Sequence, residues 1–167
     1  IGPPLAGYAA TPFFENAGYA ASHFAGVLNM DLKNRTAFVT GPAKGMGRAV
    51  TLALAKDGAD VILAGRDIAP VEDVAMEVEA LGRKATVVQC DVTDPGQVES
   101  AFAVANESSP SGVDILVNIA GGTGPIGKSG LQTTPDEFHE IMDLNVRGCF
   151  LTMRAALPGM ISSRYGK

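Results

Sequence analysis

Residues 40–47 read TGPAKGMG, and they stand between the apolar run TAFVT (36–40) and a segment in which apolar residues recur at helical spacing from Met46. Glycines at the turn from a strand to a helix permit positive φ angles and let the backbone approach a ligand closely. The helix that follows presents free N–H groups and the positive end of its dipole, which together suit a phosphate group. The stretch therefore predicts a strand, a turn that binds a dinucleotide pyrophosphate, and a helix, although glycines at a tight turn can also be purely structural.

The alternation of strand and helix continues along the chain. Short apolar runs typical of strands lie at 36–40, 60–64, 84–90 and 113–118. Helical spacing of apolar residues follows each run, with Gly58 and Gly82 at two helix ends and Asp94 and Thr134 at two helix starts. Strands that alternate with helices form a parallel sheet covered on both faces. We therefore predict an α/β fold, a doubly wound parallel sheet of the Rossmann type in three layers, whose last helix spans 135–161 with a bend near Pro158.

The composition excludes several classes of function. The chain has 167 residues and a formal net charge of −5, which disfavours a nucleic-acid-binding surface. No apolar run approaches the roughly 20 residues that a membrane helix needs. His23 and His139 lack the spacing of metal ligands, and Cys90 and Cys149 are too far apart to indicate a disulfide framework. We expect no metal, no nucleic-acid partner, no membrane span and a cytoplasmic location.

Residues 1–29 differ in composition from the rest. They are rich in Ala, Gly, Pro and aromatic residues, and Glu15 is their only charged side chain. The absence of Lys and Arg disfavours a signal peptide or a transit peptide. Because Met30 opens a stretch that reads like a natural start, we expect two parts: an extension of unknown role at 1–29 and a folded domain at 30–167.

Four motifs in a fixed order resemble those of the short-chain dehydrogenase/reductase family. TGPAKGMG resembles that family's TGxxxGxG motif, whose glycine spacing it shares. CDV at 90–92 is similar to the aspartate motif after the third strand, and NIAG at 118–121 to the NNAG motif after the fourth, with Ile119 in place of the second Asn. LNVRG at 144–148 resembles the helix segment that carries a structural and catalytic Asn. The resemblance runs from Asp31 to Lys167, and it implies that 30–167 is the N-terminal part of an NAD(P)-binding domain.

The resemblance also implies a set of site residues. The implied cofactor-binding residues are Gly41, Lys44, Gly45, Met46, Gly47, Arg66, Asp91, Val92, Asn118, Ala120 and Gly121, and the implied catalytic residue is Asn145. Asp91 could instead start a helix, and Asn118 could form a turn. Asn145 falls inside a predicted helix, where Asn is a poor helix former, and this favours a functional role for it.

The end of the second predicted strand indicates which nucleotide binds. An acidic residue there bonds the ribose hydroxyls of NAD. In this chain Gly65 occupies that position and Arg66 follows, with Lys44 in the glycine turn as a second cation. A guanidinium binds a 2′-phosphate in a fork, so we expect NADP(H) rather than NAD(H). The alternative is that Arg66 pairs with Asp60 or Asp67 on the surface.

The resemblance implies hydride transfer between a nicotinamide and a small-molecule carbonyl or alcohol substrate, with a Ser and a Tyr-x-x-x-Lys motif as catalytic groups. The chain ends in SSRYGK, whose Tyr165 and Lys167 are two residues apart, so these are not that motif. We therefore expect a fold truncated after its fourth strand and the following helix, with 113–118 as an exposed edge strand. The predicted function is an NADP(H)-dependent oxidoreductase that forms a homo-oligomer through the 135–161 helix. The alternative is a non-catalytic module that binds a nucleotide or a partner.

Overall fold

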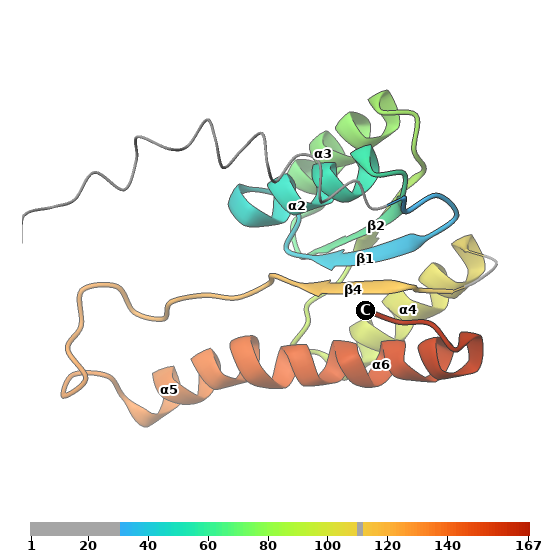
Figure 1. Cartoon of the computed structure of the whole chain (residues 1–167). Coiled ribbons are helices and arrows are strands. Elements are labelled where there is room, and N and C mark those ends of the chain that lie inside the picture. The colour runs from blue at the N-terminus through green and yellow to red at the C-terminus, as the bar shows by residue number, and fades with distance from the viewer. Residues whose placement is uncertain (1–30, 110–111) are drawn as a thin grey trace, which may run out of the picture. The chain divides into compact units, whose positions relative to one another are not determined.

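The computed structural model describes residues 31–109 and 112–167, so the predicted extension at 1–29 lies outside the described residues. Strands and helices alternate from the first element to the fourth strand (Figure 1). The elements are β1 (Thr36–Thr40), α2 (Gly45–Lys56), β2 (Asp60–Gly65), α3 (Ile68–Ala80), β3 (Ala85–Gln89), α4 (Pro95–Ser108), β4 (Ile115–Asn118), α5 (Pro135–Met142), the π-helical turn η1 (Asp143–Arg147) and α6 (Gly148–Ser163).

The four strands form one parallel sheet in the order β3-β2-β1-β4. Thr36 of β1 lies opposite Asp60 of β2, and Ala37 of β1 lies opposite Ile115 of β4. The chain therefore crosses from one side of β1 to the other between β3 and β4, which leaves a switch point at the carboxyl ends of β1 and β4. This confirms the predicted α/β fold with a doubly wound, Rossmann-type sheet.

Helices cover both faces of the sheet, as Figure 1 shows. On one face, β1 and β2 residues such as Val39 and Leu63 pack against the buried face of α3, including Val71. On the other, Phe38 stacks on Phe102 of α4, with ring centroids 4.3 Å apart. Because neighbouring residues of β1 point to opposite faces, both cores need apolar side chains on this strand. All five β1 residues are buried, which explains the continuous apolar run that predicted the strand.

Two predicted helix starts are confirmed by their capping contacts. The Asp94 carboxylate accepts hydrogen bonds from the Gly96 and Gln97 N–H groups at the start of α4. Thr134 and Glu137 form a capping box at the start of α5, each side chain accepting from the other residue's N–H. Both satisfy backbone donors that a helix start leaves free.

The predicted helix at 135–161 is present, but it is not α-helical throughout. It departs from α geometry at η1 (Asp143–Arg147), and Pro158 lies inside α6. The Asn145 side chain within η1 bonds both to Ile141, one turn back, and to Gly122, in the loop after β4. An Asn that bonds outside the helix competes with regular backbone bonding, and π turns of this kind are frequent at functional sites.

The predicted exposure of the β4 edge also needs correction, because the last residue of the chain pairs with this strand. Lys167 N–H donates to the Asp114 carbonyl at 3.1 Å, and Leu116 N–H donates to the Lys167 carbonyl at 3.0 Å. This is one step of parallel pairing, which places residue 167 opposite Ile115. The outer edge of β4 is therefore paired at its amino end.

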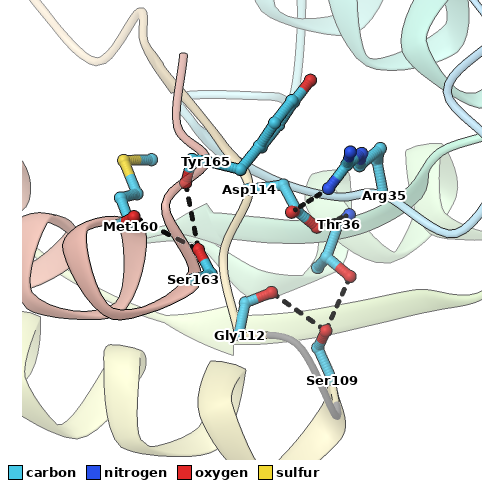
Figure 2. Close-up of polar contacts among 8 residues, drawn as sticks. All are labelled: Arg35, Thr36, Ser109, Gly112, Asp114, Met160, Ser163 and Tyr165. Carbon is cyan, nitrogen blue, oxygen red and sulfur yellow. Dashed lines mark hydrogen bonds and ion pairs between the residues drawn. The ribbon is translucent and has the colours of Figure 1, made fainter.

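A polar cluster holds this chain end in place (Figure 2). The Asp114 side chain, 1% exposed, accepts from the Arg35 guanidinium at 2.9 Å and from the Thr36 N–H at 2.9 Å. The same guanidinium carbon lies 3.6 Å from the centre of the Tyr165 ring, which is a cation–π contact. The Ser163 hydroxyl donates to the Met160 and Tyr165 carbonyls. Three distant segments of the chain therefore meet at the amino end of the sheet.

Candidate functional site

The TGPAKGMG turn lies at the carboxyl end of β1, where it closes tightly on itself. Gly41 has φ +67, and its N–H donates to the Ala64 carbonyl at 3.0 Å. A Cβ on Gly47 would overlap the Gly41 carbonyl oxygen and lie 3.0 Å from Pro42 Cα. Since both of these neighbours are backbone, no side chain fits at position 47 without opening the turn.

The start of α2 is suited to an anion. Lys44, at the N-cap, makes no capping contact with its side chain, and the first turn holds no acidic residue. Within the part of the chain that the structure describes, the first N–H groups of this twelve-residue helix therefore have no side-chain acceptor, and they point to the same side as the positive end of the helix dipole. Met46 in this first turn is 76% exposed and flanks the turn without packing into the core.

A cleft of about 290 Å³ opens between the glycine turn and the carboxyl ends of the strands. Its lining comes from four segments that sequence reasoning had selected separately: 41–44, 64–67, 90–92 and 119–121, together with Pro70, Val71 and Leu144. Of the predicted cofactor-binding residues, Gly41, Lys44, Arg66, Asp91, Val92, Ala120 and Gly121 line this cleft. Gly45, Met46 and Gly47 continue from its wall into α2.

Asp91 stands at the cleft with its carboxylate held by the next turn. Its Oδ1 accepts from the Thr93 N–H at 2.9 Å and from the Thr93 hydroxyl at 2.7 Å. The backbone hydrogen bond from Thr93 is the main cause that lowers the pKa of Asp91, and the charge of Arg66 acts in the same direction. Burial raises the pKa of the neighbouring Cys90 thiol to about 11, so this thiol is neutral at physiological pH.

The two cations of the cleft make no ion pair with any other described residue. Arg66 and Lys44 are both exposed, and neither takes part in a salt bridge within 31–109 and 112–167. Asp60, one alternative partner for Arg66, bonds Arg83 at 2.7 Å instead. Gln89 holds the Arg66 backbone by donating to its carbonyl at 3.1 Å. The guanidinium is therefore free to meet an anion from solution.

Asn118 does not line this cleft, although Ile119, which follows it, does. Its Oδ1 accepts from the Thr152 hydroxyl of α6 at 2.8 Å, and the residue lines a separate groove beside β4. The side chain therefore joins the end of β4 to α6. The backbone of the next residues is held differently, because the Thr40 hydroxyl accepts from the N–H groups of Ile119 and Ala120 at 3.0 and 3.1 Å.

Thr40 is a residue of the site that sequence reasoning did not select. It is 1% exposed and ties the carboxyl end of β1 to the loop after β4, directly beneath the cleft. Its only sequence signal is its place as the first letter of TGPAKGMG. A threonine there also fits a strand, so the sequence alone offered no reason to choose it.

Asn145 uses its side chain to hold the loop after β4 against the helix. Its Oδ1 accepts from the Gly122 N–H at 3.0 Å, and its Nδ2 donates to the carbonyls of Gly122 and Ile141 at 2.9 and 3.0 Å. The predicted catalytic role of Asn145 stays a prediction. Asn145 does not itself line the cleft; its side chain lies next to Gly121, which does, and the geometry gives it a positioning role there.

Comparison with known proteins places these features in one family. The family model described as short chain dehydrogenase matches residues 35–167. The chain belongs to the short-chain dehydrogenase family. The family identified from four motifs is thereby confirmed.

Individual relatives agree with the family model. The chain is 42% identical over 142 residues to the short chain dehydrogenase pigC of Monascus ruber, a match that covers 81% of this chain and 46% of that protein. It is 34% identical over 137 residues to an NADPH-dependent aldehyde reductase-like chloroplastic protein of Arabidopsis thaliana, covering 76% of this chain and 51% of the relative. The chain therefore spans about half the length of these two relatives.

A solved structure of this family is also similar. A metagenomic short-chain oxidoreductase in complex with NADP superposes with a TM-score of 0.76 and 29% identity, covering 81% of this chain and 61% of the other. Among the described residues, no three His, Cys, Asp or Glu side chains gather as a possible metal site. Within 31–109 and 112–167, no helix has the length and apolarity needed to cross a membrane.

Proposed function

We propose that this chain is the cofactor-binding part of an NADP(H)-dependent short-chain oxidoreductase. The observation that carries the proposal is the end of β2, where Gly65 replaces an acidic residue and Arg66 stands exposed without an ion pair among the described residues. A 2′-phosphate needs a cation there, and a carboxylate would repel it. The names of two similar proteins include NADPH or NADP, which supports the same cofactor.

The residues of the cleft fit a dinucleotide through the chemistry of their donors. The α2 N-terminus and the glycine turn would hold the pyrophosphate, and Asp91 would accept a hydrogen bond from the adenine. Arg66 and Lys44 would bind the 2′-phosphate, and Ala120 and Gly121 would border the nicotinamide half. When bound, the nicotinamide accepts or supplies a hydride. The chain's own residues bind and orient it.

Substitution of Arg66 tests the cofactor. In Arg66→Ala, we expect NADPH binding to weaken about 10- to 100-fold and NADH binding to change less than about twofold, since only NADPH carries the phosphate. Titration followed by nicotinamide fluorescence measures both dissociation constants. Arg154→Ala, an exposed arginine of α6 outside the cleft, is the matched control and should change neither. Equal losses for the two nucleotides in Arg66→Ala would refute the proposed role of its charge.

The proposed reaction is hydride transfer to or from a small-molecule carbonyl or alcohol in the whole protein. We propose that the catalytic Ser and Tyr-x-x-x-Lys lie outside these 167 residues, because Tyr165 and Lys167 are two residues apart, and Ser163, Tyr165 and Lys167 all make contacts within the fold. NADPH binding by this chain without turnover of aldehydes or ketones is the expected result. Turnover by this chain alone would overturn that division of roles.

We also propose a homo-oligomer that forms through the α5–η1–α6 segment. Seven large apolar side chains, each at least 41% exposed, recur every three or four residues along it: Phe138, Met142, Val146, Phe150, Met153, Leu157 and Ile161. Their spacing places them along one helical stripe, and an exposed apolar stripe of this length is typical of an interface. A second copy of the same helix offers a matching surface with two-fold symmetry.

A charge in this stripe should dissociate the oligomer. In Phe150→Glu, whose wild-type side chain is 56% exposed, we expect a monomer at micromolar concentration in sedimentation velocity, because a carboxylate buried without a partner is unfavourable. The thermal midpoint of the monomer should stay high enough to measure. Met76→Glu, which puts the same charge on an exposed apolar side chain of α3 outside the stripe, should leave the association unchanged. A wild-type chain that sediments as a monomer would refute this interface.

We further propose a cytoplasmic location, supported by two free cysteines and testable by cell fractionation.

A further inference from the structure

The last residue of β2 has no space for a side chain. An ideal Cβ built on Gly65 would lie 2.7 Å from Val71 Cγ2, well inside van der Waals contact. The backbone of Gly65 has no positive φ, so the restriction is one of space and not of backbone conformation. The atom that fills this space belongs to the first turn of α3.

Val71 has little freedom to move away. It is 1% exposed and belongs to the core cluster that also holds Val39, Leu63 and Val74. A valine in a helix has one strongly preferred χ1 rotamer, because its branched Cβ meets the preceding turn. The core around it is close-packed, so displacement of its methyl group would push the surrounding side chains out of their places.

The position of this contact matters for the nucleotide. Gly65, Arg66, Asp67 and Val71 all line the cleft, and position 65 is where an acidic side chain would bond the ribose hydroxyls of NAD. We propose that Val71 restricts position 65 to glycine: by occupying the space beside Gly65, it leaves no room for the acidic side chain that would favour NAD over a nucleotide with a 2′-phosphate. This inference rests on the proposed preference for NADP(H), and it adds a physical reason why residue 65 is a glycine.

The inference makes the effect of a side chain at 65 depend on residue 71. Gly65→Ala should lower the thermal midpoint by roughly 5 °C or more in the wild-type background, since overpacking of a buried site is destabilising. In the Val71→Ala background the same change should lower it by less than about 2 °C, because the space is then open. This double-mutant cycle is measured by calorimetry on the full chain without nucleotide.

The same cycle with an acidic residue tests specificity. In Gly65→Asp alone, we expect a lowered thermal midpoint and no gain in NADH affinity. In Gly65→Asp/Val71→Ala, we expect NADH to bind at least about tenfold more tightly than in Val71→Ala, and NADPH at least about tenfold more weakly. Fluorescence titration with each nucleotide gives these ratios. Gly65→Ser/Val71→Ala, which has a side chain without charge, should not reproduce the loss of NADPH affinity.

Two results would overturn the inference. The first is a shift of preference to NADH in Gly65→Asp alone with no lowering of the thermal midpoint, and the second is an equal effect of Gly65→Ala in both backgrounds. A wild-type chain without preference for NADPH would instead contradict the proposed function. The calorimetric cycle would still decide whether Val71 excludes a side chain from position 65, because it uses no nucleotide.

Discussion

Gly47→Ala is expected to weaken NADPH binding at least about 100-fold, which corresponds to about 2.7 kcal/mol of binding free energy. The added methyl group would overlap the Gly41 carbonyl oxygen and lie 3.0 Å from Pro42 Cα. Neither backbone neighbour can rotate away, so the turn must open and the N–H groups of the α2 start must move. Overpacking should also lower the thermal midpoint by roughly 5–10 °C. Isothermal titration with NADPH and calorimetry of the free chain measure the two effects.

Gly45→Ala is the matched control within the same turn. A Cβ on Gly45 meets nothing within 4 Å, so only its φ of +54 opposes the substitution. A left-handed residue with a side chain costs about 1–2 kcal/mol, and NADPH affinity should fall less than about tenfold. If Gly45→Ala and Gly47→Ala impair NADPH binding equally, the close contact between residue 47 and the Gly41 carbonyl does not determine the shape of the glycine turn.

The order of strands and helices could be predicted because each element carries its own local signal. All five β1 residues are buried because the sheet is covered on both faces, and Asp94 and Thr134 lie at helix starts as their capping patterns indicate. The sequence predicts most residues of the cleft from four segments, one at the carboxyl end of each of the four strands. Parallel strands bring their carboxyl ends to one edge, so motifs far apart in the sequence line one cleft.

The remaining features depend on contacts between distant segments, which no local pattern reveals. Asn145, within the π turn at Asp143–Arg147, bonds through its side chain to Gly122, which lies 23 residues earlier in the chain. The motif predicts that Asn118 binds the cofactor, and this stays a prediction; the bond of its side chain to Thr152 of α6, 34 residues further on, has no sequence signal. The space beside Gly65 is filled by Val71, and only the packing of α3 on β2 shows it. Each of these needs the fold before it can be inferred.

Asp114→Ala is expected to lower the free energy of unfolding by about 2–4 kcal/mol, because it leaves buried polar groups without their acceptor. The Thr36 N–H and the Arg35 guanidinium both donate to this carboxylate at 2.9 Å, and Thr36 is itself 7% exposed. Arg35 is 37% exposed on its side chain and can turn to water, which keeps the loss below that of a fully buried ion pair. Urea unfolding followed by circular dichroism measures the change.

Asp31→Ala serves as the control for a lost carboxylate, since the Lys33–Asp31 pair is 4.0 Å long with both side chains at least 70% exposed. An exposed pair of this kind contributes at most about 1 kcal/mol. Comparison of Asp114→Ala with Asp31→Ala tests whether the polar cluster around Asp114 holds residues 165–167 against β4. Arg35 joins Asp114 to the Tyr165 ring, so loss of Asp114 should also free residues 165–167 from β4. Faster amide exchange at Leu116 and Lys167 in Asp114→Ala than in Asp31→Ala is the expected signature. Equal exchange in the two variants would show that the backbone pairing of Lys167 holds the chain end without the polar cluster.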